Sequence, residues 1–488
     1  MKRREFLKSI GFGAAVLAAP GVMIGKDAGN KSKPNIILCM TDDQGWGDTG
    51  YNGRKELKTP ALDAMAGEGI RFDRWYSGAP VCSPTRGSCI TGRHPYRYGI
   101  FFANVGHMKK EEITLAEALK TQGYATGHFG KWHLGTLTRE TRDANRGGPR
   151  GVKHYSPPWE NGFDVCFATE SKVPTWDPMK RPGSDKPYGT YYWDGPEHRV
   201  TENLEGDDSR VIMDRAIPFI RGAAKAGKPF LAVIWFHSPH LPVVAGGKYR
   251  EMYKGKKGVD FLGCITAMDD QVGRLRAELK KLGAADNTML WFSSDNGPEG
   301  GKFNGANGSA GPLRGRKRSL YEGGIRVPGL LVWPAKITKS RVVKIPCSTL
   351  DYFPTVLDVL GFKMEGQPAP IDGVSLLPLI EGKMTRRPRP IGFESSGQMA
   401  LVDNRYKIYG RSGGRGGKKK KKGGKVDTSE PRGASSGGRF ELYDLIEDPG
   451  ERRNIAAEHP DIVKAMSGQL LQWRASCKTS NSGGDYKK

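Results

Sequence analysis

Several short polar clusters in this sequence carry residue types that can do chemistry, and they follow apolar runs. Asp42 and Asp43 follow the apolar run 34–40, after Thr41. Two adjacent carboxylates in such a place are costly unless a cation neutralises them. Cys82 opens the pentapeptide Cys-Ser-Pro-Thr-Arg of residues 82–86. The simpler alternatives are a solvated Asp-Asp loop and a buried thiol, so each cluster needs support from the others.

The segment 81–93 resembles the signature of the formylglycine-dependent sulfatases, members of the alkaline-phosphatase-like superfamily. Residues 82–86 follow the C-x-P-x-R pattern, and Gly87 with residues 91–93 follows the family's longer pattern. In that family the cysteine is oxidised to an aldehyde, so the resemblance implies a formylglycine derived from Cys82. One hydroxyl of the hydrated aldehyde attacks sulfur, and deprotonation of the other expels sulfate, which is covalent catalysis with a built-in exit.

Further segments, distant in the chain, match other motifs of the same family. They are the acidic pair 42–43, the GKWHLG run 130–135, the H-x-P-H-x-P segment 237–242, Ser-Asp-Asn-Gly at 294–297 and the K-x-x-x-Y-E-G-G-x-R-x-P run 317–328. The resemblance implies catalytic roles for Cys82, Arg86, Lys131, His133, His240, Asp295 and Lys317. It implies metal ligation by Asp42, Asp43, Cys82, Asp295 and Asn296.

The resemblance also implies a task for each catalytic side chain. Asp295 helps to activate the hydrate, His240 protonates the leaving oxygen and His133 assists sulfate release. Charge on the transferring group is offset by the metal and by three cations, Arg86, Lys131 and Lys317. Oxygen ligands select Ca²⁺ or Mg²⁺ over Zn²⁺, and the family favours calcium, with magnesium as the second choice. Three neighbouring arginines, at 314, 316 and 318, leave the register of Lys317 open.

Two other functions compete with hydrolysis of sulfate esters. The same metal scaffold could hydrolyse phosphate or phosphonate esters, which have a similar tetrahedral shape. The chain could also be a non-catalytic protein that binds polyanions. Every position that the sulfatase reaction needs is present, which argues against loss of catalysis.

The first 30 residues are typical of an export signal. Arg3-Arg4 and Phe6-Leu7-Lys8 precede an apolar run from 10 to 24, as in twin-arginine signals. A short membrane anchor is the alternative, but the run is shorter than about 20 residues and is broken by Gly and Pro. We expect the twin-arginine machinery and a formylglycine-generating maturation enzyme as partners, and a periplasmic or extracellular location.

The net charge limits the class of binding partner that we expect, and the cysteine spacing bears on possible disulfides. The 488 residues carry a formal net charge of +25, which favours anionic partners. No nucleic-acid motif accompanies the charge, so we expect a sulfated carbohydrate substrate and no nucleic acid. The seven cysteines have no C-x-x-C spacing, which leaves one or two disulfides open. The Gly/Lys-rich loop 413–425 is either a tolerated insertion or a holder of a polymeric substrate.

Alternating apolar runs and helical patterns predict an α/β fold with a large, mostly parallel sheet sandwiched by helices. The polar clusters would then meet at the carboxyl ends of its strands. We expect a catalytic domain at 31–384 and, by resemblance, a smaller α+β domain with an antiparallel sheet at 385–488. Residues 136–205, rich in Gly, Pro and aromatic residues, are interpreted as a long insertion over the active-site face.

Overall fold

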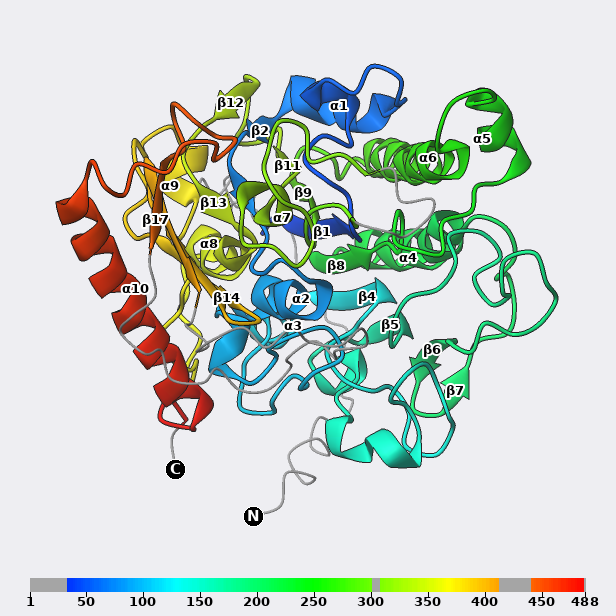
Figure 1. Cartoon of the computed structure of the whole chain (residues 1–488). Coiled ribbons are helices and arrows are strands. Elements are labelled where there is room, and N and C mark those ends of the chain that lie inside the picture. The colour runs from blue at the N-terminus through cyan, green and yellow to red at the C-terminus, as the bar shows by residue number, and fades with distance from the viewer. Residues whose placement is uncertain (1–32, 301–307, 412–439, 487–488) are drawn as a thin grey trace, which may run out of the picture. The chain divides into compact units, whose positions relative to one another are not determined.

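The centre of the fold is one mixed sheet of ten strands (Figure 1). The computed structural model describes residues 33–300, 308–411 and 440–486. Across the sheet the order is β12 (Arg341–Val343), β2 (Ile70–Phe72), β11 (Gly329–Val332), β9 (Thr288–Ser294), β1 (Asn35–Thr41), β8 (Phe230–Trp235), β4 (Ala125–Lys131), β5 (Val165–Thr169), β6 (Tyr192–Gly195) and β7 (His198–Arg199). The run from β9 to β5 is parallel, and antiparallel pairs flank it on both sides. The predicted fold class is confirmed.

Helices cover both faces of this sheet because its central strands are apolar on both sides. In β1, Ile36 and Leu38 pack into one hydrophobic core, whereas Ile37 and Cys39 pack into the other. The first core includes side chains of α2 (Cys82–Thr91), α3 (Leu115–Lys120) and α8 (Tyr352–Leu360). The second includes side chains of α1 (Pro60–Glu68), α4 (Asp208–Lys225) and α6 (Val259–Lys281). Figure 1 shows α4 and α6 on one side of β1 and β8, with α2 and α3 on the other.

Strand register brings the polar clusters to one edge of the sheet. Thr41 at the end of β1 pairs with Ser294 at the end of β9. Trp235, the last residue of β8, pairs with Met40 of β1 and with Gly130 of β4. The segments that follow these strands therefore leave the sheet side by side, where ligands collect in open α/β sheets.

A separate antiparallel sheet lies towards the carboxyl end of the chain, as predicted. It has the order β14 (Ile391–Ser395), β15 (Gln398–Val402), β16 (Tyr406–Arg411) and β17 (Glu441–Asp444), and α10 (Pro460–Asn481) packs against it. Lys407 of this sheet is fully buried, with its Nζ 3.1 Å from a Glu322 oxygen and 2.8 Å from a Glu451 oxygen. This triad ties the small sheet to the segment around Glu322. The predicted domain boundaries stay predictions.

The remaining elements are short. A three-stranded sheet joins β10 (Arg326–Val327), β3 (Trp75–Tyr76) and β13 (Cys347–Ser348). Further helices are α5 (Gly247–Met252), α7 (Glu322–Ile325) and α9 (Leu377–Ile380). Turns of 3₁₀ helix occur at Gly50–Asn52, Pro95–Arg97, Pro149–His154, Pro158–Glu160 and Thr349–Asp351.

The interpretation of residues 136–205 as an insertion is wrong in part. β5 pairs in parallel with β4, and β6 and β7 extend the same sheet. The pattern hid these strands because they are short and lie between Gly- and Pro-rich loops. Tyr192 and Trp193 are buried, and their polar atoms bond to Asp208 and Asp143, so these two aromatic side chains pack rather than face a ligand.

The remaining expectations concern the export signal, the Gly/Lys-rich loop, the disulfides and a membrane anchor. The predicted export signal 1–30 and the loop 413–425 lie outside the described residues. All seven cysteines are unpaired thiols, so the open question of disulfides is answered in the negative for this structure. Among the described residues, no helix has the length and apolar character needed to cross a membrane.

Candidate active site

Cys82 is the first residue of α2, and the entire helix is buried. Backbone N–H groups without helical partners surround such a helix start, which favours an anionic ligand there. The Cys82 sulfur and one oxygen each from Asp42 and Asp295 lie within 4.8 Å of one another. Burial raises the pKa of the Cys82 thiol. The helix therefore begins with a neutral, enclosed side chain set directly against two carboxylates.

The carboxylates come from the ends of β1 and β9. The backbone N–H of Asp43 donates to Asp295 Oδ1 at 3.1 Å, and Asn296 Nδ2 donates to Asp43 Oδ1 at 2.7 Å. Asp43 takes a left-handed backbone conformation (φ 66°), which is uncommon for a residue other than glycine. The turn after β1 is thus held by side chains of the loop after β9, and the two segments bring Asp42, Asp43 and Asp295 together.

Three buried cations balance these three carboxylates. An Arg86 nitrogen lies 2.7 Å from Asp295 and 3.3 Å from Asp42. The other two pairs are Lys131 with Asp42, and Lys317 with Asp43 at 2.7 Å. The guanidinium of Arg86 also bonds to the Lys131 carbonyl oxygen at 2.9 Å.

The carboxyl groups respond differently to this environment. Burial opposes ionisation of Asp42, but the charge of Lys131 and the other nearby cations outweighs it, so the pKa of Asp42 falls well below its usual range. Burial and the Asp42 charge raise the pKa of Asp295 to about 7. One carboxylate of the site is therefore firmly ionised, and another can exchange a proton near neutral pH.

The structure also shows which residue of the basic run 314–318 lies beside the carboxylates. The backbone N–H of Lys317 donates to the Pro298 carbonyl at 3.1 Å, and the next N–H, of Arg318, donates to the Pro80 carbonyl at 2.8 Å. These bonds fix the segment against the residues before Cys82 and after Asn296. The three arginines have other partners: Arg314 with Tyr443, Arg316 with the Gly308 carbonyl, and Arg318 with Glu299. The lysine beside the carboxylates is Lys317.

Two histidines reach the same cluster. His240 Nδ1 lies 2.6 Å from the Leu241 carbonyl oxygen, so this nitrogen carries the hydrogen, and Nε2 lies 3.6 Å from Asp43. His133 Nε2 donates to Asn104 Oδ1 at 3.0 Å, which leaves its buried Nδ1 without a hydrogen-bond partner among the described residues. Burial and the charges of nearby cations, Lys131 among them in both cases, hold the pKa of both imidazoles well below the usual range.

Two contacts of the cluster were not anticipated from the sequence. Asn104 orients His133, and the Trp235 ring lies 5.2 Å from the Arg86 guanidinium carbon. No motif marks Asn104. Trp235 could have been found as the last residue of an apolar strand whose neighbours carry the polar clusters.

The donor set fits a hard divalent cation. The Asp42 Oδ1 and Asn296 Oδ1 atoms are buried and lack hydrogen-bond partners within the described part of the chain. Buried oxygens of this kind normally have a partner. The Cys82 sulfur stands where an aldehyde-derived oxygen would lie after oxidation. With Asp43 and Asp295 these atoms supply the oxygen ligands that calcium or magnesium prefers.

Comparison with known proteins agrees with this geometry. N-acetylgalactosamine-6-sulfatase of Mus musculus is 32% identical over 81% of this chain and 74% of its own. The solved structure of Ps i-CgsB with k-i-k-neocarrahexaose is 25% identical, with a TM-score of 0.73 over 91% of this chain and 93% of that chain. Phosphonate monoester hydrolase of Agrobacterium radiobacter shares the fold at 19% identity and a TM-score of 0.61, over 91% of this chain and 96% of that chain.

The family-level match covers the polar clusters described above. Residues 34–362 match the sulfatase family model, a range that contains Cys82, all three cations and all three carboxylates. This chain therefore belongs to the sulfatase family and is a hydrolase of sulfuric esters.

Proposed function

We propose that this sulfatase removes sulfate from a sulfated carbohydrate, using a formylglycine made from Cys82 and a bound calcium ion. The name of the mouse relative specifies a sulfated amino sugar, and Ps i-CgsB was solved with a saccharide. The formal net charge of +25 suits a substrate that carries several negative groups. The observation that carries the proposal is the buried cluster in which Cys82 lies close to three carboxylates and three cations.

The chain's cations would bind and orient the sulfate group. The ammonium groups of Lys131 and Lys317 pair with Asp42 and Asp43, and the Arg86 guanidinium pairs with Asp295. A divalent metal held by the predicted ligands would add positive charge that polarises the sulfate oxygens. The hydrated aldehyde supplies the attacking hydroxyl. Asp295, whose carboxylate lies beside the Cys82 side chain, accepts the proton of that hydroxyl.

His240 and His133 would move the other protons. His240 delivers a proton from Nε2 to the leaving oxygen, because Nδ1 is already committed to the Leu241 carbonyl. Burial and the lysine charges disfavour its protonated form. An anionic sulfate ester offsets those charges and raises its pKa in the complex. His133, held by Asn104 through Nε2, keeps Nδ1 for the proton that is removed when sulfate leaves.

The decisive experiment combines a mass measurement with a substrate comparison. The chain is produced together with a formylglycine-generating enzyme, and the peptide that contains Cys82 is analysed for the aldehyde. Hydrolysis of matched aryl sulfate and aryl phosphate esters is then measured for the wild type and for Cys82→Ala. We expect aldehyde in the active preparation, preference for the sulfate and loss of turnover in the variant. An active preparation with only unmodified thiol would contradict the mechanism, and preference for phosphate would favour the phosphate or phosphonate ester hydrolase.

We also propose export through the twin-arginine route, on the basis of the Arg3-Arg4 pair. The test fuses residues 1–32 to a reporter that functions only outside the cytoplasm. Changing both arginines to lysine should stop export, and a fusion that is still exported would exclude this route.

A further inference from the structure

Lys172 lies next to the cluster around Cys82 but takes no part in its ion pairs. It follows the end of β5 by three residues, and Thr169, the last residue of β5, pairs with Lys131 at the end of β4. The Thr169 hydroxyl donates to the Ser171 carbonyl at 2.7 Å and lies 2.8 Å from His237 Nε2. These contacts hold the backbone before Lys172 at the same edge of the sheet.

The ammonium group of Lys172 has no counter-charge of its own. The side chain is half-buried, and it forms neither a hydrogen bond nor an ion pair with any residue that the structure describes. Burial and the charges of Lys131 and Lys317 lower the pKa of Lys172, and its own charge contributes to lowering that of His240. A partly desolvated cation without a partner is costly, so this position is suited to an anion that comes with the substrate.

A cavity of about 430 Å³ opens beside Lys172. None of its lining residues is acidic, and its polar lining comes from Asn145, Ser171, Lys172, Arg181, Tyr188 and Thr190. Of the Arg181 guanidinium nitrogens, only Nε forms a hydrogen bond with a described residue, which it donates to the Pro187 carbonyl at 3.2 Å. The Tyr188 hydroxyl has no hydrogen-bond partner among the described residues. Two cations and a phenol in a cavity of sugar size form a polar recognition site rather than an apolar one.

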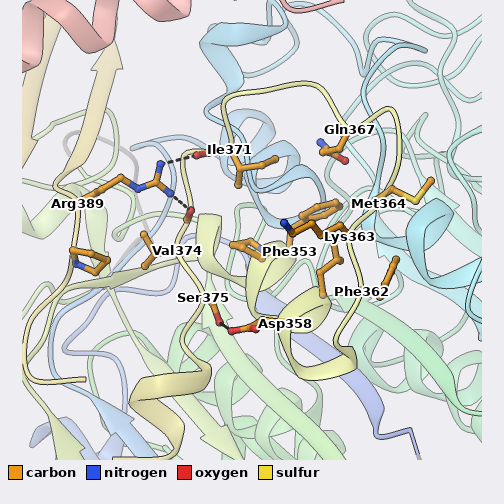
Figure 2. Close-up of a pocket in the computed structure, with 14 residues that line it drawn as sticks. Phe353, Asp358, Phe362, Lys363, Met364, Gln367, Ile371, Val374, Ser375 and Arg389 are labelled. Atoms are coloured by element: carbon orange, nitrogen blue, oxygen red, sulfur yellow. Dashed lines mark hydrogen bonds between the residues drawn. The ribbon is translucent and has the colours of Figure 1, made fainter. Parts of the chain in front are cut away.

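Two other cavities in the described part of the chain do not combine these features. A neighbouring cavity of about 340 Å³ contains Lys180, but Asp185 neutralises it at 3.0 Å. A cavity of about 540 Å³ beside α8 is mainly apolar. Figure 2 shows its Arg389 turned towards the carbonyl oxygens of Ile371 and Gly373, which accept hydrogen bonds at 3.2 and 2.7 Å. The Arg389 guanidinium is therefore already used, and the lining of that cavity, which also holds Lys363, includes the acidic Asp358.

We propose that the Lys172 cavity is a subsite for a second anionic group of the saccharide, a carboxylate or a further sulfate carried beyond the ester that is cleaved. Lys172 binds this group, and Arg181 and Tyr188 border it. The inference rests on the proposed function, since it assigns a neighbouring subsite of the same substrate. Lys172 is a specificity-determining residue here and has no role in bond breaking.

The experiment compares saccharides that differ by one charge. The probes are N-acetylgalactosamine 6-sulfate, its disaccharide with a uronic acid, the same disaccharide with the carboxyl group reduced to an alcohol, and N-acetylgalactosamine 4,6-disulfate. Binding to the mature enzyme is measured by calorimetry, and sulfate release is measured in parallel. The variants are Lys172→Met and, as a matched control, Lys186→Met, an exposed lysine of the same region that does not line the cavity.

We expect the wild type to prefer doubly charged over singly charged sugars, and Lys172→Met to reduce that preference by at least about 10-fold, the effect of losing one hydrogen bond to a charged group. Because the measure is a ratio, a general loss of affinity for sulfate cancels. Lys186→Met should leave the ratio unchanged. Comparing the uronate with its reduced form, and the mono- with the disulfate, identifies which anion is bound.

Two outcomes would overturn the inference. One is a wild type that binds singly and doubly charged sugars equally, and the other is an unchanged preference in Lys172→Met. A wild type that shows the preference by calorimetry but releases sulfate from no sugar would instead refute the proposed function and keep the subsite.

Discussion

Replacing Arg86 by methionine will remove the one cation that two buried carboxylates share. The Arg86 nitrogen lies 2.7 Å from Asp295 and 3.3 Å from Asp42, and all three side chains are fully buried. Breaking a buried ion pair by removing one partner costs about 3–5 kcal/mol, because the remaining charge is left without compensation. Native proteins are stable by only about 5–15 kcal/mol. We therefore expect the variant to lose a large part of its free energy of unfolding.

The assay is urea denaturation in the presence of a chelator, so that only protein groups compensate the carboxylates. The loss should be larger at pH 8 than at pH 6. The pKa of Asp295 is about 7 in the wild type and rises further without Arg86, so at pH 6 the carboxyl group is neutral and costs less to bury. Arg86→Met/Asp295→Asn should be more stable than the sum of the single losses predicts, by about 1–3 kcal/mol.

A surface pair provides the control. Arg453 and Glu458 lie 2.8 Å apart, almost the same separation, but their side chains are 72% and 50% exposed. Arg453→Met should cost less than about 1 kcal/mol. Equal losses in Arg86→Met and Arg453→Met would show that burial does not set the strength of the Arg86 pair, and the charge balance inferred for the site would be wrong.

Three further predictions test other parts of the molecule. His240→Ala should slow hydrolysis of sugar sulfates far more than of activated aryl sulfates, because help with proton transfer is worth about 10²–10⁴-fold where the leaving oxygen is basic; equal losses in kcat/KM would move this role elsewhere. Burial lowers the pKa of His94 to about 3, so the folded state stays neutral while the unfolded state takes up a proton below its ordinary pKa of about 6.5. Between pH 7 and pH 5 this should remove about 2 kcal/mol of stability in urea titrations, and His94→Asn should flatten that loss. Lys407→Met should destabilise the fold by about 3–5 kcal/mol by removing the cation that the buried Glu322 and Glu451 share, with partial rescue by Glu451→Gln; an unchanged midpoint would mean that the triad does not hold the small sheet.

The sequence predicts much of the cluster because apolar strands deliver their polar residues to one edge. The runs that become β1, β8 and β9 are short and mostly apolar, and each is followed by residues that can do chemistry, as is the more mixed run that becomes β4. Parallel strands force those residues to a common edge. That Asp42, Lys131 and Asp295 lie together could therefore be predicted without an alignment, whereas their roles came from the resemblance to a family.

What the sequence did not predict depends on contacts between distant loops. Asn104 precedes no motif and gains its place only because the chain folds back against His133. Lys172 follows β5, whose five residues lie between Gly- and Pro-rich segments and resembled a loop. The partners of the basic run 314–318 are groups from distant loops, such as the Tyr443 hydroxyl and the Glu299 carboxylate, so the spacing of residues in the sequence left Lys317 and its arginine neighbours interchangeable.

The balance of charge in the site explains how one cluster can hold both a cation and an anion. Arg86, Lys131 and Lys317 match Asp42, Asp43 and Asp295 one for one. The cluster is therefore near neutrality by itself, which lets it stay buried at tolerable cost. The sulfatase family uses a divalent metal, and two added positive charges in so enclosed a place would leave the site strongly attractive to a sulfate ester. Binding of cation and substrate should therefore reinforce each other, each raising the affinity for the other by the same factor.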